Sequence, residues 1–243
     1  MMGFVESLLA ATLSAAPALI FASLGAVVSE RSGVVNIGIE GMMRVGAFAA
    51  AVSALYLPTP MAVLVGCLAG ALAAGIHALL SLAARADQVV SGMALNLVAM
   101  AGVTFLLETW FQPSGTPSVQ TLSRYRFEWL GGIPLLRAFN GHTLLTPIAL
   151  AMPFLLHLLI QRTAWGLRVR TVGERPEAAA TLGISVLSLR TFCVVASGVL
   201  SGLGGAALSL STLDRFEQHM PAGLGFMAVS AMVFGRWSPL GAA

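Results

Sequence analysis

Long apolar runs separated by short polar segments make up most of the chain. A membrane-spanning helix needs about 20 predominantly apolar residues, and the pattern predicts about seven spans. Their approximate bounds are Leu8–Val28, Ala47–Leu57, Met61–Ala84, Arg85–Phe111, Leu144–Ile160, Thr191–Leu213 and Gly223–Phe234. Backbone groups in lipid must be paired inside a helix or a closed barrel, and uninterrupted runs favour helices over the alternating strands of a barrel. We therefore expect an all-α integral membrane protein, a polytopic helical bundle that forms one transmembrane domain over residues 1–243.

Composition agrees with this prediction. Hydrophobic residues make up 57% of the chain and charged residues 9%, whereas soluble domains carry roughly a quarter charged residues. The formal net charge of +3 comes with arginines at the ends of the spans, where they are typical of anchoring in a lipid bilayer. Membrane lipid is thus an expected partner, and nucleic acid is not.

Two segments are polar enough to lie in water. Residues 161–190 carry five arginines and two glutamates between two apolar runs. Residues 112–143 are rich in proline and glycine, and they form an expected external loop. Aromatic and arginine side chains typical of an element along the bilayer surface occur in it: Arg124, Tyr125, Arg126, Phe127 and Trp129. This loop is either a covering loop or a docking surface for another protein.

The first polar segment contains the pattern of a short, bounded helix between Gly173 and Gly183. Pro176 suits the first helical position because its missing N–H would be unpaired there anyway. Glu174 and Glu177 are expected at the positive end of the helix dipole, and Gly183 can adopt the left-handed conformation that ends a helix. The residues alone allow two interpretations, a rigid contact helix or an ordinary solvated loop with one helical turn.

The sequence from Thr163 to Ile184 fits the pattern T-x-x-G-L-x-x-R-x-V-G-E-x-P-E-A-A-x-x-x-G-I. This pattern resembles the cytoplasmic loop of bacterial ABC importer permeases, and within them the branched-chain amino-acid, ribose and nucleoside permease family. In that family the loop holds the coupling helix, which fits into a cleft of the ATP-hydrolysing subunit. The resemblance implies that the ATPase-coupling residues are Gly173, Glu174, Arg175, Pro176, Glu177, Ala178, Ala179 and Gly183.

A second informative segment runs from Ser29 to Ala47. Its glycines predict an unwound or tightly packed start of the second span. Glu40 and Arg44 are four residues apart and would meet on one helix face, either as part of a pathway or gate or as a structural ion pair. This segment resembles the amino-terminal signature of the nucleoside-type branch, with the pattern S-E-R-S-G-V-V-N-I-G-I-E-G-M-M-x-x-G-A. Arg44 departs from the signature, because an apolar residue is expected at its position. Asn36 and Glu40 are therefore candidate residues of the translocation pathway.

A third block, R-A-D-Q-V-V-S-G-M-A-L-N from Arg85 to Asn96, also resembles this family. Asp87 can cap the following helix, and Asn96 is a polar group inside lipid that should find a partner on another helix. Asn96 is a candidate pathway residue, with simple hydrogen bonding between helices as the alternative. His77 is expected to be a hydrogen-bonded interior histidine rather than a transport residue.

Small residues recur at helical spacing in two of the spans. One span carries Gly66, Gly70 and Ala74, and the other carries two pairs, Gly198 with Gly202 and Ser201 with Gly205. Such stripes allow close helix packing in membranes, so the span Thr191–Leu213 is expected to be a tightly packed central helix.

Counting the spans assigns every loop to a side of the membrane. If residues 161–190 are cytoplasmic, the loops at Glu30–Arg31 and Arg85 are cytoplasmic too, and the amino terminus and residues 112–143 are external. Seven arginines then lie in inside loops and four in outside loops, a bias that fits the positive-inside rule. The last residues resemble the middle of a family motif, G-x-W-x-P-L-G-A, which leads into further helices. We therefore expect the chain to lack about two carboxy-terminal spans.

No pattern for catalysis is visible. The sequence contains no G-x-x-x-x-G-K-[ST] phosphate loop, no serine, histidine and aspartate arrangement and no metal-binding spacing, so we expect a transport subunit without a metal or cofactor rather than an enzyme. The resemblance implies that this chain lies in the bacterial inner membrane and has three partners. They are cytoplasmic ABC ATPase subunits, a second homologous permease subunit, and a periplasmic or lipid-anchored substrate-binding protein. It points to nucleosides as the solute, with simple sugars and branched-chain amino acids as alternatives.

Two interpretations from other protein classes remain beside this one. A secondary transporter driven by an ion gradient would carry paired charges near mid-bilayer in two repeated halves, and no such repeat is visible. A non-catalytic membrane assembly subunit would show no dependence on a solute.

Overall fold

The computed structural model describes residues 2–111, 115–125 and 140–243, with side chains from residue 5 onward. Among the described residues, five helical segments are long and apolar enough to cross a membrane: Val5–Arg31, Thr59–Ala83, Gln88–Trp110, Leu145–Arg162 and Val186–Thr212. They contain α1 (Met2–Arg31), α3 (Thr59–Ala78), α4 (Gln88–Trp110), α5 (Leu145–Arg162) and α8 (Val186–Ala207). A π-helical turn extends α3 over Leu79–Ala83 and α8 over Leu208–Thr212. The all-α class that the apolar runs predict is confirmed.

Two further apolar helices are shorter. α2 (Ile39–Ser53) has 15 residues and α9 (Leu224–Phe234) has 11. At 1.5 Å per residue they extend about 22 and about 16 Å, less than the roughly 30 Å hydrocarbon core of a bilayer. The seven expected spans thus correspond to five full-length helices and two short ones. The second expected span begins earlier than predicted, at Ile39, because the glycines and charges between Ile39 and Ala47 are already helical.

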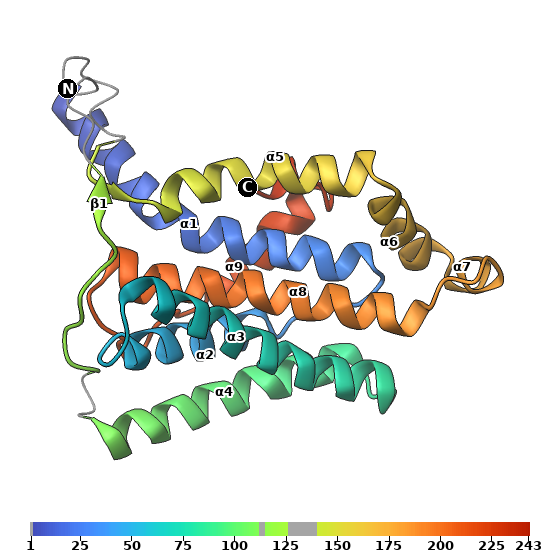
Figure 1. Cartoon of the computed structure of the whole chain (residues 1–243), viewed down its shortest axis with the longest axis horizontal. Coiled ribbons are helices and arrows are strands. Elements are labelled where there is room, and N and C mark those ends of the chain that lie inside the picture. The colour runs from blue at the N-terminus through green and yellow to red at the C-terminus, as the bar shows by residue number, and fades with distance from the viewer. Residues whose placement is uncertain (1, 112–114, 126–139) are drawn as a thin grey trace.

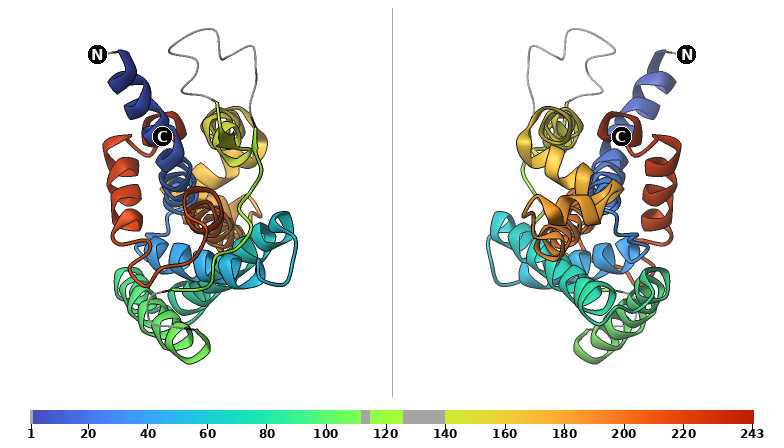
Figure 2. Two further views of the ribbon diagram at one scale, coloured as in Figure 1. Left: turned by 90° about the vertical axis from the view of Figure 1, so that its left-hand side faces the viewer. Right: turned by 90° about the vertical axis from the view of Figure 1, so that its right-hand side faces the viewer.

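The long helices run roughly along the long axis of the molecule, and α8 lies in the middle of them (Figures 1 and 2). α1, α2 and α3 pack directly against α8, whereas α4 packs on α2 and α5 on α1. The predicted central position of the span Thr191–Leu213 is therefore confirmed. The outward faces of α3, α4 and α5 expose large apolar side chains, among them Leu72, Phe105 and Phe154, which suits helices bordered by lipid tails.

The glycine stripes explain how closely α3 and α8 approach each other. A Cβ atom added to Gly70 would overlap the carbonyl oxygen of Gly198, and one added to Gly202 would overlap that of Gly66. Any side chain at these positions would force the two helices apart. This is the packing that the stripes predict.

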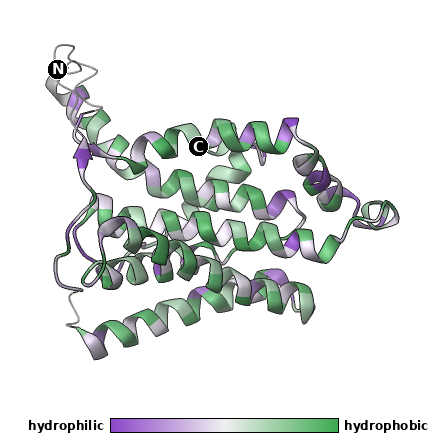
Figure 3. Cartoon of the chain, in the orientation of Figure 1, coloured by the Kyte–Doolittle hydropathy of each residue, from purple (hydrophilic) through white to green (hydrophobic). Residues whose placement is uncertain are grey.

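The two ends of the bundle gather different segments. One end, here called the α7 end, holds the junction of α1 and α2, the turn between α3 and α4, and the helices α6 (Ala164–Glu174) and α7 (Pro176–Thr181). α7 extends beyond the other helices (Figure 1). The opposite end holds residues 115–125, which we call the strap, and residues 210–216, which pair with it. Counting spans in the sequence predicts the same grouping. Hydrophilic residues lie mainly toward the two ends, with apolar residues between them (Figure 3).

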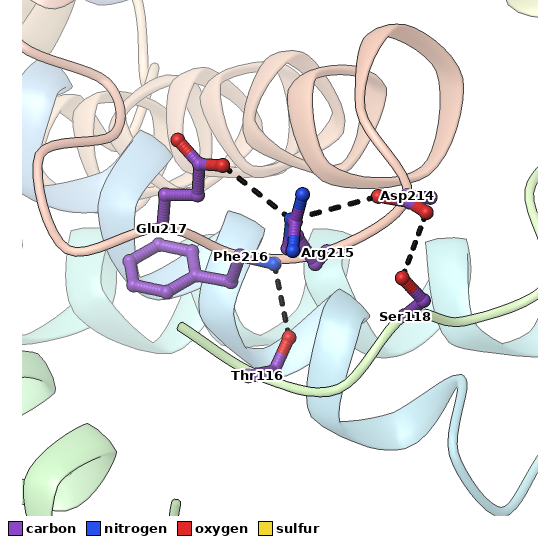
Figure 4. Close-up of polar contacts among 6 residues, drawn as sticks. All are labelled: Thr116, Ser118, Asp214, Arg215, Phe216 and Glu217. Carbon is purple, nitrogen blue, oxygen red and sulfur yellow. Dashed lines mark hydrogen bonds and ion pairs between the residues drawn. The ribbon is translucent and has the colours of Figure 1, made fainter. Parts of the chain in front are cut away.

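The strap runs across one end of the bundle and pairs with residues 210–216. Three backbone hydrogen bonds of 2.7–3.0 Å join Thr116 to Phe216, Val119 to Asp214 and Leu122 to Leu210. Two side-chain hydrogen bonds add to them, Ser118 Oγ to the Asp214 carboxylate at 2.8 Å and the Phe216 N–H to Thr116 Oγ1 at 3.0 Å (Figure 4). The described part of residues 112–143 therefore fits the covering-loop interpretation.

The strap ends in a short strand that pairs with a second one. β1 (Arg124–Tyr125) pairs antiparallel with β2 (His142–Thr143), with Arg124 opposite Thr143. The predicted surface residues Arg126, Phe127 and Trp129 lie outside the described residues. The short helix α10 (Pro239–Ala242) packs against α9 and α5.

Candidate functional site

The polar segment after α5 folds into two helices rather than one. Thr163 caps α6, since its Oγ1 accepts a hydrogen bond from the Gly166 N–H at 3.1 Å. α7 begins at Pro176, and Gly183 has a φ of +77° just beyond its end, both as predicted. α6 was missed because its arginines suggested a loop. It is an amphipathic helix, which buries Val169 and Val172 completely while its other face is exposed.

The position of Glu174 differs from the prediction. Glu174 is the last residue of α6, where the helix dipole is negative, whereas Glu177 lies in the first turn of α7, where the dipole is positive. Both side chains, and that of Arg175, are exposed, and in α7 only Ala179 is fully buried. α7 is therefore a small, exposed helix that α6 holds at the end of the bundle.

The chain between α1 and α2 is not helical from Ser32 to Gly38, and we call these residues the break. Gly33 in the break has a φ of +81°, which favours glycine. This is the unwound start of the second span that the glycines predict. Because lipid offers no hydrogen-bond partner, the backbone groups of the break need partners from the protein.

Two asparagines supply such partners. Asn96 on α4 donates from Nδ2 to the carbonyl oxygen of Ile37 at 2.9 Å, and its Oδ1 accepts from the Gly41 N–H at 2.8 Å. Asn36 is buried, accepts from the Gly38 N–H at 3.1 Å, and donates to Ser197 Oγ on α8 at 3.1 Å. Both amides therefore hold the break in place against α4 and α8.

His77 on α3 also contacts the break. Its ring is fully buried, with Nδ1 3.1 Å from Ser91 Oγ on α4 and Nε2 3.4 Å from the carbonyl oxygen of Val35. The predicted interior, hydrogen-bonded histidine is confirmed.

Asp87 caps α4 as predicted, because its carboxylate accepts from the Val90 N–H at 2.9 Å.

The two charged side chains of α2 face the segment before α9 instead of each other. Glu40 Oε1 accepts from the Gly223 N–H at 2.7 Å, and Arg44 Nη1 donates to the carbonyl oxygen of Gln218 at 2.8 Å. The expected ion pair between Glu40 and Arg44 is absent from the described residues. Each charge has instead found a backbone group that the non-helical residues before α9 leave unpaired, a contact that spacing within one helix does not reveal.

Glu40 thus lies where the amino-terminal ends of two short helices meet. It is in the first turn of α2 and contacts Gly223, the residue that caps α9. The positive ends of both helix dipoles favour a negative charge there. Its second carboxylate oxygen, Oε2, is buried and has no hydrogen-bond partner among the described residues. Ionisable groups inside a membrane protein usually have a functional role, and Glu40 retains an unused acceptor.

The candidate residues fall into two groups. Asn36, Glu40 and Asn96 surround the break and the start of α2, whereas the expected coupling residues lie on or beside α7. Ser197 and Gly223 could not be predicted as partners of these residues, because a small residue in an apolar run is explained equally well by packing. Within the described ranges no cluster of three or more histidine, cysteine or acidic residues could hold a metal ion.

Comparison with known proteins identifies the family. The family described as branched-chain amino acid transport system, permease component, matches residues 8–243. A nucleoside ABC transporter permease protein of Lactococcus lactis is 40% identical over 233 residues, which cover 92% of this chain and 74% of that protein. A guanosine ABC transporter permease protein of Bacillus subtilis is 38% identical over 242 residues, covering 96% of this chain and 76% of the relative.

A third relative carries a different solute in its name. A putative glucose ABC transporter permease protein of Haloferax volcanii is 36% identical over 240 residues, covering 98% of this chain and 73% of the relative. No solved structure is significantly similar to the chain. From the matched residues 8–243 and these identities, the chain belongs to the family of permease components of branched-chain amino acid transport systems.

Proposed function

We propose that this protein is the permease subunit of an ATP-driven ABC importer that carries nucleosides across the cytoplasmic membrane, as a multi-pass membrane protein. The observation that carries the proposal is the exposed helix α7, held by α6 at one end of a bundle of apolar helices. The sequence from Thr163 to Ile184, which includes α6 and α7, resembles the coupling loop of ABC permeases. The chain is thus a transport component, and ATP hydrolysis belongs to separate cytoplasmic subunits.

The nucleoside assignment is supported by the names of two relatives, one a nucleoside permease and one a guanosine permease. The Haloferax relative, named for glucose, supports a simple sugar as the second candidate. Nucleosides and sugars share hydroxyl groups. The unpaired Oε2 of Glu40 is an acceptor that suits such a hydroxyl.

In the proposed mechanism, ATPase subunits dock on α7 and push on it when they bind ATP. The expected coupling residues from Gly173 to Gly183 receive this push, and the permease alternates between outward and inward access. A second, similar permease subunit completes the pathway, and a substrate-binding protein delivers the solute. Asn36, Glu40 and Asn96 border the pathway, and α2 and α9 each reach part of the way across the membrane beside the five long helices.

Charge reversal on α7 tests the proposal. In the variant Glu174→Arg/Glu177→Arg, we expect the affinity of the ATPase subunits for the permease to fall at least tenfold, because two exposed side chains change the sign of their charge. Uptake should fall with it. Copurification and uptake of labelled nucleoside measure both effects. Glu217→Arg, an exposed site at the strap end, is the matched control and should leave association unchanged. Normal assembly and transport in the double variant would rule out the role of α7.

The energy source separates this proposal from a secondary transporter. In vesicles that contain the complete importer, uptake should require ATP inside and should persist when an ionophore removes the ion gradient. Competition between labelled nucleoside and unlabelled glucose then identifies the preferred solute. Uptake that survives ATP depletion and collapses with the ion gradient would favour the secondary transporter instead.

A further inference from the structure

Arg190 links the α6–α7 segment to the break. It lies near the start of α8, and its guanidinium has two backbone partners from different parts of the chain. Nε donates to the carbonyl oxygen of Ser32 at 3.0 Å, and Nη2 donates to the carbonyl oxygen of Val172 at 3.3 Å. Ser32 is the first residue of the break and Val172 lies in the last turn of α6. One rigid, planar group with several donors therefore joins three elements.

Backbone contacts beside Arg190 make this junction tight. A Cβ atom added to Gly173 would overlap the carbonyl oxygen of Arg31, the last residue of α1. A Cβ atom added to Gly33 would lie 2.9 Å from Arg190 Nη2 and 3.1 Å from the Cα atom of Gly173. No side chain separates α6 from the break at this point. A displacement of α6 therefore cannot be absorbed by a change of rotamer and must move the break or separate the contact.

The break is also held at its other end. Asn36, four residues after Ser32, is bonded to Ser197 on α8, and Asn96 holds the backbone on either side of Gly38. Glu40 follows immediately in the first turn of α2. The seven residues of the break thus form a short connection, fixed by Arg190 at the α7 end and by the two asparagines next to Glu40.

We propose that Arg190 transmits the movement of α6 and α7 to the break, and so to the residues around the start of α2. This inference rests on the proposed function, because it requires a push on α7 from ATPase subunits. Arg190 is a positioning residue, because it acts through the carbonyl oxygens of Val172 and Ser32. The side chain couples the two segments only while it holds both oxygens at once.

The test uses the complete importer in proteoliposomes with its ATPase subunits and binding protein. In Arg190→Gln we expect normal assembly and basal ATP hydrolysis within about twofold, whereas solute uptake per ATP hydrolysed falls at least tenfold. Stimulation of hydrolysis by the loaded binding protein should also be lost. Arg190→Lys should give an intermediate loss, since an ammonium group lacks the planar fork that reaches both oxygens. Arg85→Gln, an exposed arginine at the same end of the bundle, is the control and should keep the normal ratio.

Two results would overturn the inference. One is a normal ratio of uptake to ATP hydrolysis in Arg190→Gln. The other is a parallel fall of assembly, hydrolysis and uptake in both Arg190 variants, which indicates a purely structural side chain. Failure of the proposed function looks different, because the Glu174→Arg/Glu177→Arg variant would then keep its ATPase subunits whatever the Arg190 variants do.

Discussion

At the scale of single residues, side-chain amides replace the hydrogen bonds that a continuous helix would make. Asn96 pairs with the carbonyl oxygen of Ile37 and the N–H of Gly41, on both sides of the point where α2 begins. The sequence allows the prediction that Asn96 finds a partner on another helix. It does not identify this partner, because that depends on how α4 is shifted along α2. Of its two predicted roles, hydrogen bonding between helices is the one that these contacts directly support.

Replacing Asn96 by aspartate tests that role. Asn96→Asp removes the N–H group that donates to the carbonyl oxygen of Ile37 but keeps an oxygen that can accept from the Gly41 N–H. We expect the unpaired carbonyl to cost about 1–3 kcal/mol of stability, visible as a lower midpoint of thermal unfolding in detergent. The solute concentration that gives half-maximal uptake should stay within about twofold. A large change in that concentration at unchanged stability would instead make Asn96 a contact of the solute.

At the scale of the elements, the position of the helices in the chain was easier to predict than their ends. The apolar runs predict the presence of α1, α3, α4, α5 and α8, although the predicted starts of α1 and α8 are too late, and their small-residue stripes predict the central place of α8. They fail for α6, whose arginines hide a buried valine face, and for the start of α2. Both depend on neighbouring groups from elsewhere in the chain: α6 packs on the backbone at the end of α1, and the start of α2 bonds to the Gly223 N–H and to the Asn96 side chain.

Two glycines of α3 provide a matched comparison. In Gly70→Ala the added methyl group overlaps the backbone of Gly198 on α8, and we expect a loss of about 1–3 kcal/mol from overpacking. In Gly75→Ala on the same helix the methyl group meets nothing within 4 Å, so stability should be unchanged or rise by up to about 1 kcal/mol. Thermal unfolding of the two variants measures the difference. Equal midpoints would contradict the close packing of α3 and α8.

At the scale of the whole molecule, parity and arginine counts predict which loops share a side. The structure brings these loops together at the two ends of the bundle, with Trp237 also bonded to Glu30 at the α7 end. The Glu40 contacts could not be predicted in this way, because they depend on the non-helical residues before α9 reaching the start of α2. Patterns of apolar and polar residues do not show how far a non-helical segment enters the bundle.

Cysteine labelling in intact cells tests the assigned sides. In a chain with Cys67→Ala and Cys193→Ala, we introduce Leu182→Cys beside α7 and, separately, Tyr56→Cys at the strap end; both positions are highly exposed. An impermeant maleimide should label the cysteine at position 56 from outside and the cysteine at position 182 only after the membrane is opened. Labelling of position 182 in intact cells would place α7 in the external compartment and contradict the proposed ATPase contact.

The glycine contacts between α3 and α8 restrict how this protein can be varied. Glycine has no smaller substitute, so every missense change at Gly70, Gly198 or Gly202 adds atoms where a neighbouring backbone already lies. Gly102 on α4 faces open space and carries no such restriction. Libraries built to alter which solute is carried should therefore leave the α3 and α8 glycines unchanged and place their diversity elsewhere.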